Sequence, residues 1–231
     1  GLLNRMVDIL LRISPNEKVY DLKLAIIENC IYGSDIQRIA AQITKLRFFI
    51  SLICSCEKDA TKPNFGIPTL PNLETKFVAA NSLISKKRQV SRNLFENPEI
   101  EPTKEELTRI RHEHFSAKTA NRKSILREQD QILREKLAKL LADDEDFAPE
   151  DAKQLAAWNP YDQNAESPFF DPAWMFGVND GFDIVIGNPP YIQLQNNGGE
   201  LAKLYEPCGY KTFAKTGDIY CLFYERGYQL L

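Results

Sequence analysis

A short, mainly apolar run at residues 182–186 (FDIVI) constrains the fold of this chain more than any other feature. It is rich in β-branched residues, and Gly181 and Gly187 bound it. A run of this length and composition is typical of a strand covered on both faces in a parallel sheet. Because ligands of open α/β sheets bind beyond the carboxyl ends of the strands, the residues that follow fall where a site is expected.

Those residues are Asn188, Pro189, Pro190 and Tyr191, and their chemistry suits a flat aromatic amine. Such an amine is a poor nucleophile because its lone pair is delocalised into the ring. The side-chain oxygen of Asn188 and the carbonyl of Pro189 can each accept one amine hydrogen, which favours a tetrahedral nitrogen. The prolines hold the loop in one shape, and Tyr191 offers a ring on which an extruded base can stack. The structural alternative is a strand ended by a Pro-Pro turn, with Tyr191 as ordinary packing.

With these residues the chain resembles the N6-adenine DNA methyltransferases that use S-adenosylmethionine, whose catalytic motif is Asn-Pro-Pro-Tyr after such a strand. Residues 181–192 are most similar to the branch found in type IIG restriction-modification enzymes and phage-defence methylases. The resemblance implies an α/β fold, namely a partial Rossmann-like methyltransferase sheet with a long helical insertion. It also implies S-adenosylmethionine as cofactor, double-stranded DNA with a flipped adenine as partner, and a parent chain to which a restriction endonuclease can be fused.

A second stretch, residues 31–36 (IYGSDI), predicts a strand that ends in an acid and is followed by a helix. This order places the Asp35 carboxylate at the carboxyl edge of the sheet, where it can accept both hydroxyls of a ribose. The resemblance implies the same role for Asp35 and places Ile36 against the adenine of the cofactor. The alternative is that Asp35 caps the following helix, since aspartate is among the best N-cap residues.

A third stretch, residues 74–84, alternates like a strand and ends in the polar pair Asn81 and Ser82. The resemblance implies that this pair contacts the cofactor, with the side-chain oxygen of Asn81 accepting a hydrogen bond from the adenine amino group. The alternative is that Asn81 forms a turn.

A fourth stretch, residues 216–226, resembles the segment that follows the catalytic loop in these enzymes. There Phe223 matches an aromatic residue that packs on the cofactor. Taken without the resemblance, the stretch predicts an amphipathic helix that is capped by Asp218 and buries Phe223 in the core.

These stretches divide the chain into three parts. Residues 1–84 supply the ribose- and adenine-contacting strands, residues 85–174 form a helical insertion with an acidic, proline-rich connection, and residues 175–231 hold the catalytic strand, its loop and the next helix. Within the insertion, apolar residues recur at helical spacing among many charges and predict a hairpin of amphipathic helices. They are Leu107, Ile110, Leu126, Leu133, Leu137 and Leu140.

One expected element is missing from the sequence. In the family, a strand and a glycine-rich loop precede the acidic residue that matches Asp35, and that strand lies in the middle of the sheet. Before Asp35 this chain has only Gly1 and Gly33, and it stops at Leu231 inside a predicted helix without a cap. We therefore expect an internal fragment, with an open sheet edge beside residues 182–186 and weak cofactor binding by the fragment itself.

Composition limits the class of protein without naming a function. With 43% hydrophobic and 26% charged residues the chain is of an ordinary globular type, and its net charge of -3 gives no broad attraction to phosphate. The five cysteines show no Cys-x-x-Cys pair, and no apolar run is long enough to cross a membrane, so we expect free thiols and a cytoplasmic protein. His112 and His114 lie two apart on a predicted helix and point apart, so no metal site is expected.

Two other functions fit part of these observations. Enzymes that methylate a protein glutamine amide at N5 also use Asn-Pro-Pro-Tyr on a planar nitrogen, but they are compact where this chain has its insertion. A non-catalytic interaction module built on half a methylase would explain the missing glycine loop. The long insertion and residues 31–36 (IYGSDI) favour DNA methylation over the first of these functions, and the intact motif at residues 188–191 argues against the second.

Overall fold

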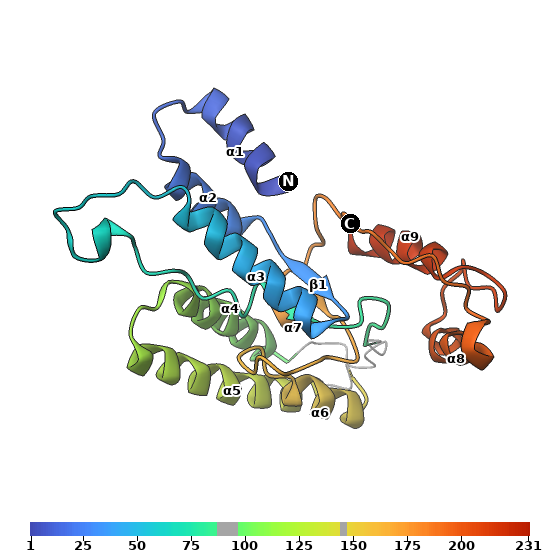
Figure 1. Cartoon of the computed structure of the whole chain (residues 1–231). Coiled ribbons are helices and arrows are strands. Elements are labelled where there is room, and N and C mark those ends of the chain that lie inside the picture. Colours follow the sequence, from blue (N-terminus) through green and yellow to red (C-terminus); the bar gives the residue numbers. More distant parts are fainter. Residues whose placement is uncertain (87–96, 144–146) are drawn as a thin grey trace.

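The computed structural model describes residues 1–86, 97–143 and 147–231. Its sheet has two parallel strands, β1 (Gly33–Asp35) and β2 (Phe77–Ala79), with Gly33 opposite Phe77 and Asp35 opposite Ala79. Helix α3 (Arg38–Ile53) follows β1 and packs on both strands (Figure 1). The predicted order of strand, acid and helix around Asp35 is confirmed. Gly33 is required here, because a Cβ atom at this position would lie 2.7 Å from the Phe77 ring.

Two helices precede the sheet, α1 (Leu2–Ile13) and α2 (Val19–Asn29). They form one hydrophobic cluster with α3, β2 and the end of α4, with Ile27 and Leu52 fully buried at its centre. A 3-10 turn, η1 (Pro63–Gly66), lies in the connection from α3 to β2. The cluster holds the helices on the sheet and so fixes the direction of β1.

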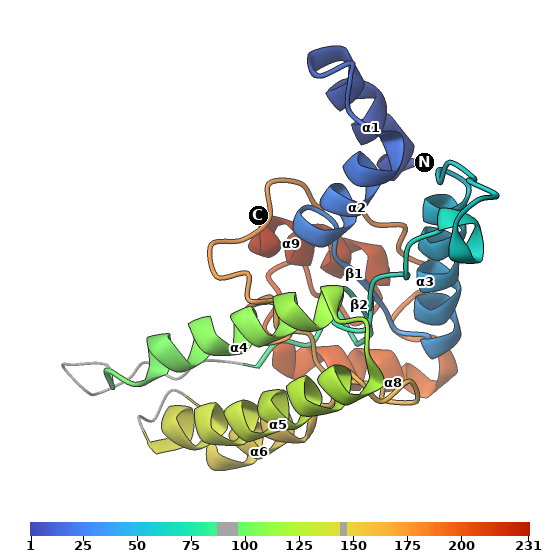
Figure 2. The ribbon, with the colours of Figure 1, turned by 90° about the vertical axis from the view of Figure 1, so that its left-hand side faces the viewer.

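The insertion forms the predicted helical hairpin. Helices α4 (Ile100–Ser116) and α5 (Ala120–Asp143) lie side by side, and α6 (Pro149–Ala157) packs on α5 (Figure 2). The predicted apolar positions face inward, since Leu107, Ile110, Leu126 and Leu137 are all less than 5% exposed. Helix α5 ends at Asp143; the rest of the acidic run, residues 144–146, lies outside the described residues.

A buried cluster of charges links helices α4 and α5 to each other and to α6 and α7. The Asp130 carboxylate is fully buried and accepts hydrogen bonds of 2.7 Å from Arg111 Nε and from Arg134 Nε, and one of 3.2 Å from the Tyr161 hydroxyl. Burial alone would raise the pKa of Asp130, but the two guanidinium groups outweigh it and hold this pKa below its ordinary value. The arginines also donate to backbone carbonyls beyond the hairpin: Arg111 to Met175, at 3.2 Å, and Arg134 to Ala156, at 2.6 Å.

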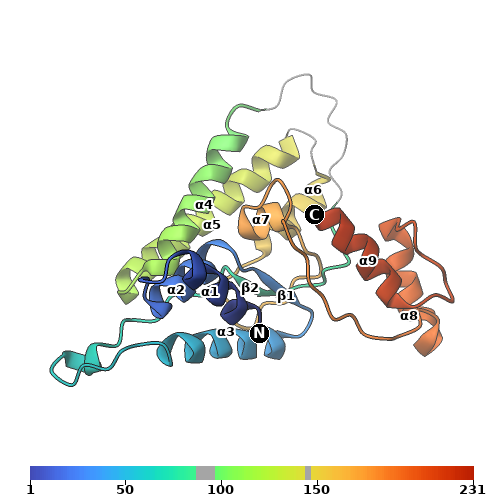
Figure 3. The same cartoon turned by 90° about the horizontal axis from the view of Figure 1, so that it is seen from above.

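The C-terminal part contains α7 (Pro172–Phe176), α8 (Asn196–Tyr205), the 3-10 turn η2 (Glu206–Cys208) and α9 (Ile219–Leu230). Figure 3 shows α8 and α9 together at one side of the hairpin. Helix α9 begins as predicted, because the Asp218 side chain accepts a 3.1 Å hydrogen bond from the Tyr220 amide. Among the described residues, none of the helices combines the length and the apolar character that a membrane span needs.

The strand predicted at residues 182–186 is wrong. The segment has no regular secondary structure, and Ile184 and Ile186 are 72% and 71% exposed where burial on both faces was expected. A strand is defined by its ladder with a neighbour, and within the described residues β1 pairs with β2 and the segment pairs with neither. Its start is bonded to α9 instead, through a 2.8 Å hydrogen bond from the Phe182 amide to the Leu230 carbonyl.

The buried His114 gives the fold a pH dependence that can be measured. Its side chain is fully buried, and burial, reinforced by the nearby Arg127 and opposed by Glu74, lowers its pKa. The unfolded state, with an ordinary pKa of about 6.5, therefore binds more protons than the folded state. We expect the free energy of unfolding to fall as the pH drops below about 6.5.

Urea unfolding between about pH 5 and about pH 8 measures this effect. His114→Gln should flatten the pH dependence over this range. His112→Gln is the comparison on the same helix: the His112 side chain is 62% exposed and lies 3.4 Å from the Glu28 carboxylate, so this variant changes a surface contact and no buried group. An equally steep dependence in His114→Gln would contradict the assignment.

Candidate active site

The Asn-Pro-Pro-Tyr segment lies open on the surface. Asn188 is exposed, and Tyr191 is 85% exposed. Within the described residues, neither the Asn188 side chain nor the Pro189 carbonyl takes part in a hydrogen bond. Both acceptors that the chemistry of an amine requires are thus without a hydrogen bond in the part of the chain that the structure describes.

The chain just after this segment is joined to the start of α9. The Ile219 amide donates a 2.9 Å hydrogen bond to the Ile192 carbonyl, and the Leu194 amide donates one of the same length to the Gly217 carbonyl. Residues 192–194 and 217–219 therefore run antiparallel and hydrogen-bonded. This pairing sets the position of the segment relative to α9.

Asp35 is the last residue of β1 and is exposed. Its Oδ1 accepts a 2.8 Å hydrogen bond from the Gln37 amide, but Gln37, not Asp35, occupies the N-cap of α3. The capping alternative therefore does not describe Asp35, whose second carboxylate oxygen has no bond within the described residues. Ile36 follows with 62% of its side chain exposed, so an acceptor and an apolar surface lie next to each other at this edge.

Asn81 is mostly buried, and its side chain is engaged. Its Oδ1 accepts a 3.2 Å hydrogen bond from the Leu83 amide, and its Nδ2 donates to the Tyr205 hydroxyl at 3.2 Å. This bonding is that of the turn former considered as the alternative. Ser82 Oγ lies 3.0 Å from Ser34 Oγ and so ties the turn to β1.

Phe223 is half-buried against the C-terminal hydrophobic cluster of α8 and α9, which matches the core position considered for it. Sequence reasoning missed Arg226 on the same helix. Arg226 is 7% exposed, and its guanidinium donates to the Ser82 carbonyl at 2.8 Å and to the Phe170 carbonyl at 3.0 Å. The sequence indicated this position, because Arg226 comes four residues after Leu222 and therefore lies on the same, inward-facing side of the helix.

Asp35, Asn81 and Asn188 each follow a predicted strand, and two of them lie at one edge of the observed sheet. Asp35 ends β1, and Asn81 follows the end of the parallel strand β2, so both lie at the same edge. Asn188 does not follow a strand, because residues 182–186 pair with neither β1 nor β2.

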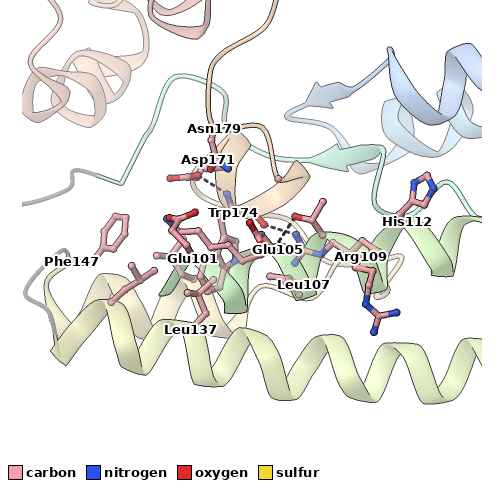
Figure 4. Close-up of a pocket in the computed structure, with 17 residues that line it drawn as sticks. Glu101, Glu105, Leu107, Arg109, His112, Leu137, Phe147, Asp171, Trp174 and Asn179 are labelled. Atoms are coloured by element: carbon pink, nitrogen blue, oxygen red, sulfur yellow. Dashed lines mark hydrogen bonds and ion pairs between the residues drawn. The ribbon is translucent and has the colours of Figure 1, made fainter. Parts of the chain in front are cut away.

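A separate cavity of about 490 Å³ lies between α4, α5, α6 and residues 171–179 (Figure 4). Its wall combines apolar side chains such as Leu107 and Leu137 with the carboxylates of Glu105 and Asp171. It includes none of the candidate residues above, so it is distinct from the candidate active site.

Comparison with known proteins identifies the family. The family described as Eco57I restriction-modification methylase matches residues 29–231. A protein of Methanocaldococcus jannaschii named as a type II restriction enzyme and methyltransferase is 42% identical over 66 residues, which are 29% of this chain and 5% of that protein. This chain thus matches a small part of a much longer relative. No solved structure matches the chain. Because the family match covers most of the sequence, the chain belongs to the Eco57I restriction-modification methylase family.

Proposed function

We propose that the chain forms part of the catalytic domain of a DNA methyltransferase that transfers a methyl group from S-adenosylmethionine to N6 of adenine, in a restriction-modification or phage-defence system. The observation that carries this proposal is the Asn-Pro-Pro-Tyr segment in a restriction-modification methylase. The segment is exposed, and its two acceptors have no hydrogen bond to the described residues. The other observations agree with it but would not suffice without this segment.

The residues of the segment divide the work on the target amine. The Asn188 side-chain oxygen and the Pro189 carbonyl each accept one amine hydrogen, and these bonds strengthen as the nitrogen becomes tetrahedral. Tyr191 stacks on the base after it has left the duplex. To bind the amine, neither the side-chain oxygen nor the carbonyl has to give up a hydrogen bond to any of the described residues.

The residues at the sheet edge fit the adenosine part of the cofactor. Asp35 has a carboxylate oxygen available for the ribose, and Ile36 offers an exposed apolar side chain for the adenine. Asn81 and Ser82 form a turn next to Asp35 and Ile36. Phe223 packs against the C-terminal hydrophobic cluster of α8 and α9. When bound, S-adenosylmethionine supplies an electrophilic methyl group.

A strand and a glycine-rich loop from outside the 231 residues complete this domain in our proposal. The support is the open side of the sheet. The Phe182 ring lies 5.9 Å from the ring of Tyr32, which immediately precedes β1, yet among the described residues no strand lies between β1 and the exposed Ile184 and Ile186. An added strand there would cover both isoleucines.

Titration calorimetry with S-adenosylmethionine, together with a methylation assay on adenine-containing DNA, tests the proposal. The 231-residue chain should bind the cofactor weakly or not at all, because its sequence has no glycine-rich segment before Asp35 to hold the methionine end. A longer polypeptide with the preceding glycine-rich segment should bind it and yield N6-methyladenine.

Two variants of the longer polypeptide sharpen this test. Asp35→Ala should weaken cofactor binding, whereas Asp8→Ala, an exposed aspartate on α1, should not. Micromolar binding and methyl transfer by the 231 residues would contradict the requirement for a further segment. Methylation of a glutamine peptide in place of DNA would replace the proposed substrate.

A further inference from the structure

Three tyrosine rings form a row at the candidate active site. The ring centroids of Tyr191 and Tyr220 lie 6.0 Å apart with planes inclined at 60°, and those of Tyr220 and Tyr224 lie 6.0 Å apart at 83°. Tyr220 and Tyr224 are four residues apart on α9 and therefore share one face of the helix. Helix α9 thus supplies two of the three rings: Tyr220 contacts Tyr191, and Tyr224 contacts Tyr220.

The backbone under this row is fixed. Helix α9 starts at the cap made by Asp218, and the hydrogen bond from Ile219 to Ile192 joins its first turn to the residue next to Tyr191. Because this short pairing connects the two backbones directly, the backbone of Tyr220 has a defined place relative to the Tyr191 loop.

The Tyr191 ring has little other support. It is 85% exposed, and within the described residues Tyr220 is its one ring partner and its hydroxyl has no hydrogen bond. The preceding prolines fix the backbone but not the torsions of a tyrosine side chain. An edge-to-face contact favours one ring orientation and leaves at least one face of the Tyr191 ring for a further aromatic group.

We propose that Tyr220, supported by Tyr224, is a positioning residue that sets the orientation of the Tyr191 ring on which the extruded base stacks. This inference rests on the proposed function, because it takes Tyr191 as the stacking residue. It adds residues on α9 that do not themselves contact the reacting amine.

The orientation can be measured in the 231-residue chain without any substrate. With fluorotyrosine at position 191, fluorine NMR should show the resonance shifted by the neighbouring ring. Tyr220→Leu should move it toward the value of free fluorotyrosine, while Tyr220→Phe should keep it. Tyr228→Leu is the matched control, since Tyr228 is 81% exposed on the same helix and no ring contact joins it to the row in the described residues. An unchanged resonance in Tyr220→Leu would overturn the proposal.

The consequence for catalysis is tested in a methylase that contains this chain. Tyr220→Leu should lower kcat/KM for DNA roughly two- to ten-fold, the range expected for one lost aromatic pair, with the KM for S-adenosylmethionine unchanged. Tyr220→Phe, which keeps the ring, should retain activity. 2-Aminopurine at the target position should fluoresce more strongly with Tyr220→Leu, because the extruded 2-aminopurine stacks less well on Tyr191. Should Tyr220→Leu fail to fold, Tyr224→Leu, at a position 74% exposed, is expected to give a smaller loss of the same kind.

The outcomes separate the two proposals. If Asn188→Ala retains full activity, the proposed function fails whatever the tyrosines do. If Asn188→Ala is inactive but Tyr220→Leu and Tyr224→Leu are as active as Tyr228→Leu, the positioning role alone is overturned.

Discussion

Replacing Asn188 with alanine in a methylase that contains this chain is expected to lower the turnover of adenine methylation by about 10²-fold to 10³-fold, the usual effect of losing one preorganised transition-state hydrogen bond. The acceptor matters most as the amine becomes tetrahedral, so the affinity for S-adenosylmethionine should not change. Single-turnover transfer of a labelled methyl group to DNA measures the effect.

The position of Asn188 makes this experiment clean. Its side chain is exposed and has no hydrogen bond within the described residues, so alanine should leave the free energy of unfolding unchanged. Asn121→Ala is the control. Asn121 is an exposed asparagine on α5, far from Asn188 in the sequence, and a variant that loses its side-chain amide should remain fully active. Near-normal methylation by Asn188→Ala would show that another group accepts the amine hydrogens.

Replacing Asp130 with asparagine should lower the free energy of unfolding at neutral pH by about 3–5 kcal/mol, as expected when one partner of a buried ion pair is removed. Asp130 is fully buried between Arg111 and Arg134, whose side chains are 7% and 4% exposed, so two guanidinium groups would be left without a counter-charge. Urea unfolding measures the loss. Glu128→Gln, at an exposed position on the same helix, should change little.

The pH dependence offers a second check on Asp130. Because its folded pKa lies below the unfolded value of about 3.9, its stabilisation is complete above about pH 4 and is lost as the pH falls further. The wild type and Asp130→Asn should therefore differ at neutral pH and converge in acid. Equal unfolding free energies at neutral pH would mean that the cluster does not hold the hairpin.

Elements with local causes could be predicted from the sequence. The capped helix at Asp218 and the hairpin of apolar positions such as Leu126 follow from spacing within a few turns. The order of strand, acid and helix around Asp35 was predicted for the same reason. For the helices, the residues that determine the element lie inside it, whereas β1 also required its neighbour β2.

Elements that depend on distant partners could not be predicted. Residues 182–186 have the composition of a strand, but a strand requires a neighbour, and the described residues provide none. The turn at Asn81 depends on Leu83 and on the distant Tyr205, and Arg226 reaches a carbonyl far from it in sequence. Tyr220 supports Tyr191 through a pairing of two loops that composition does not reveal.

The hydrogen bonds that join residues 192–194 to residues 217–219 also bear on how this protein can diversify. They bring the two ends of residues 195–216 together, so that this stretch leaves the Asn-Pro-Pro-Tyr segment and returns to almost the same place. Closing a longer loop costs little, about 0.6 kcal/mol for each doubling of its length. Insertions can therefore accumulate in the exposed parts of this stretch during evolution without altering the geometry of Asn188, while the buried Tyr205, which is bonded to Asn81, is retained.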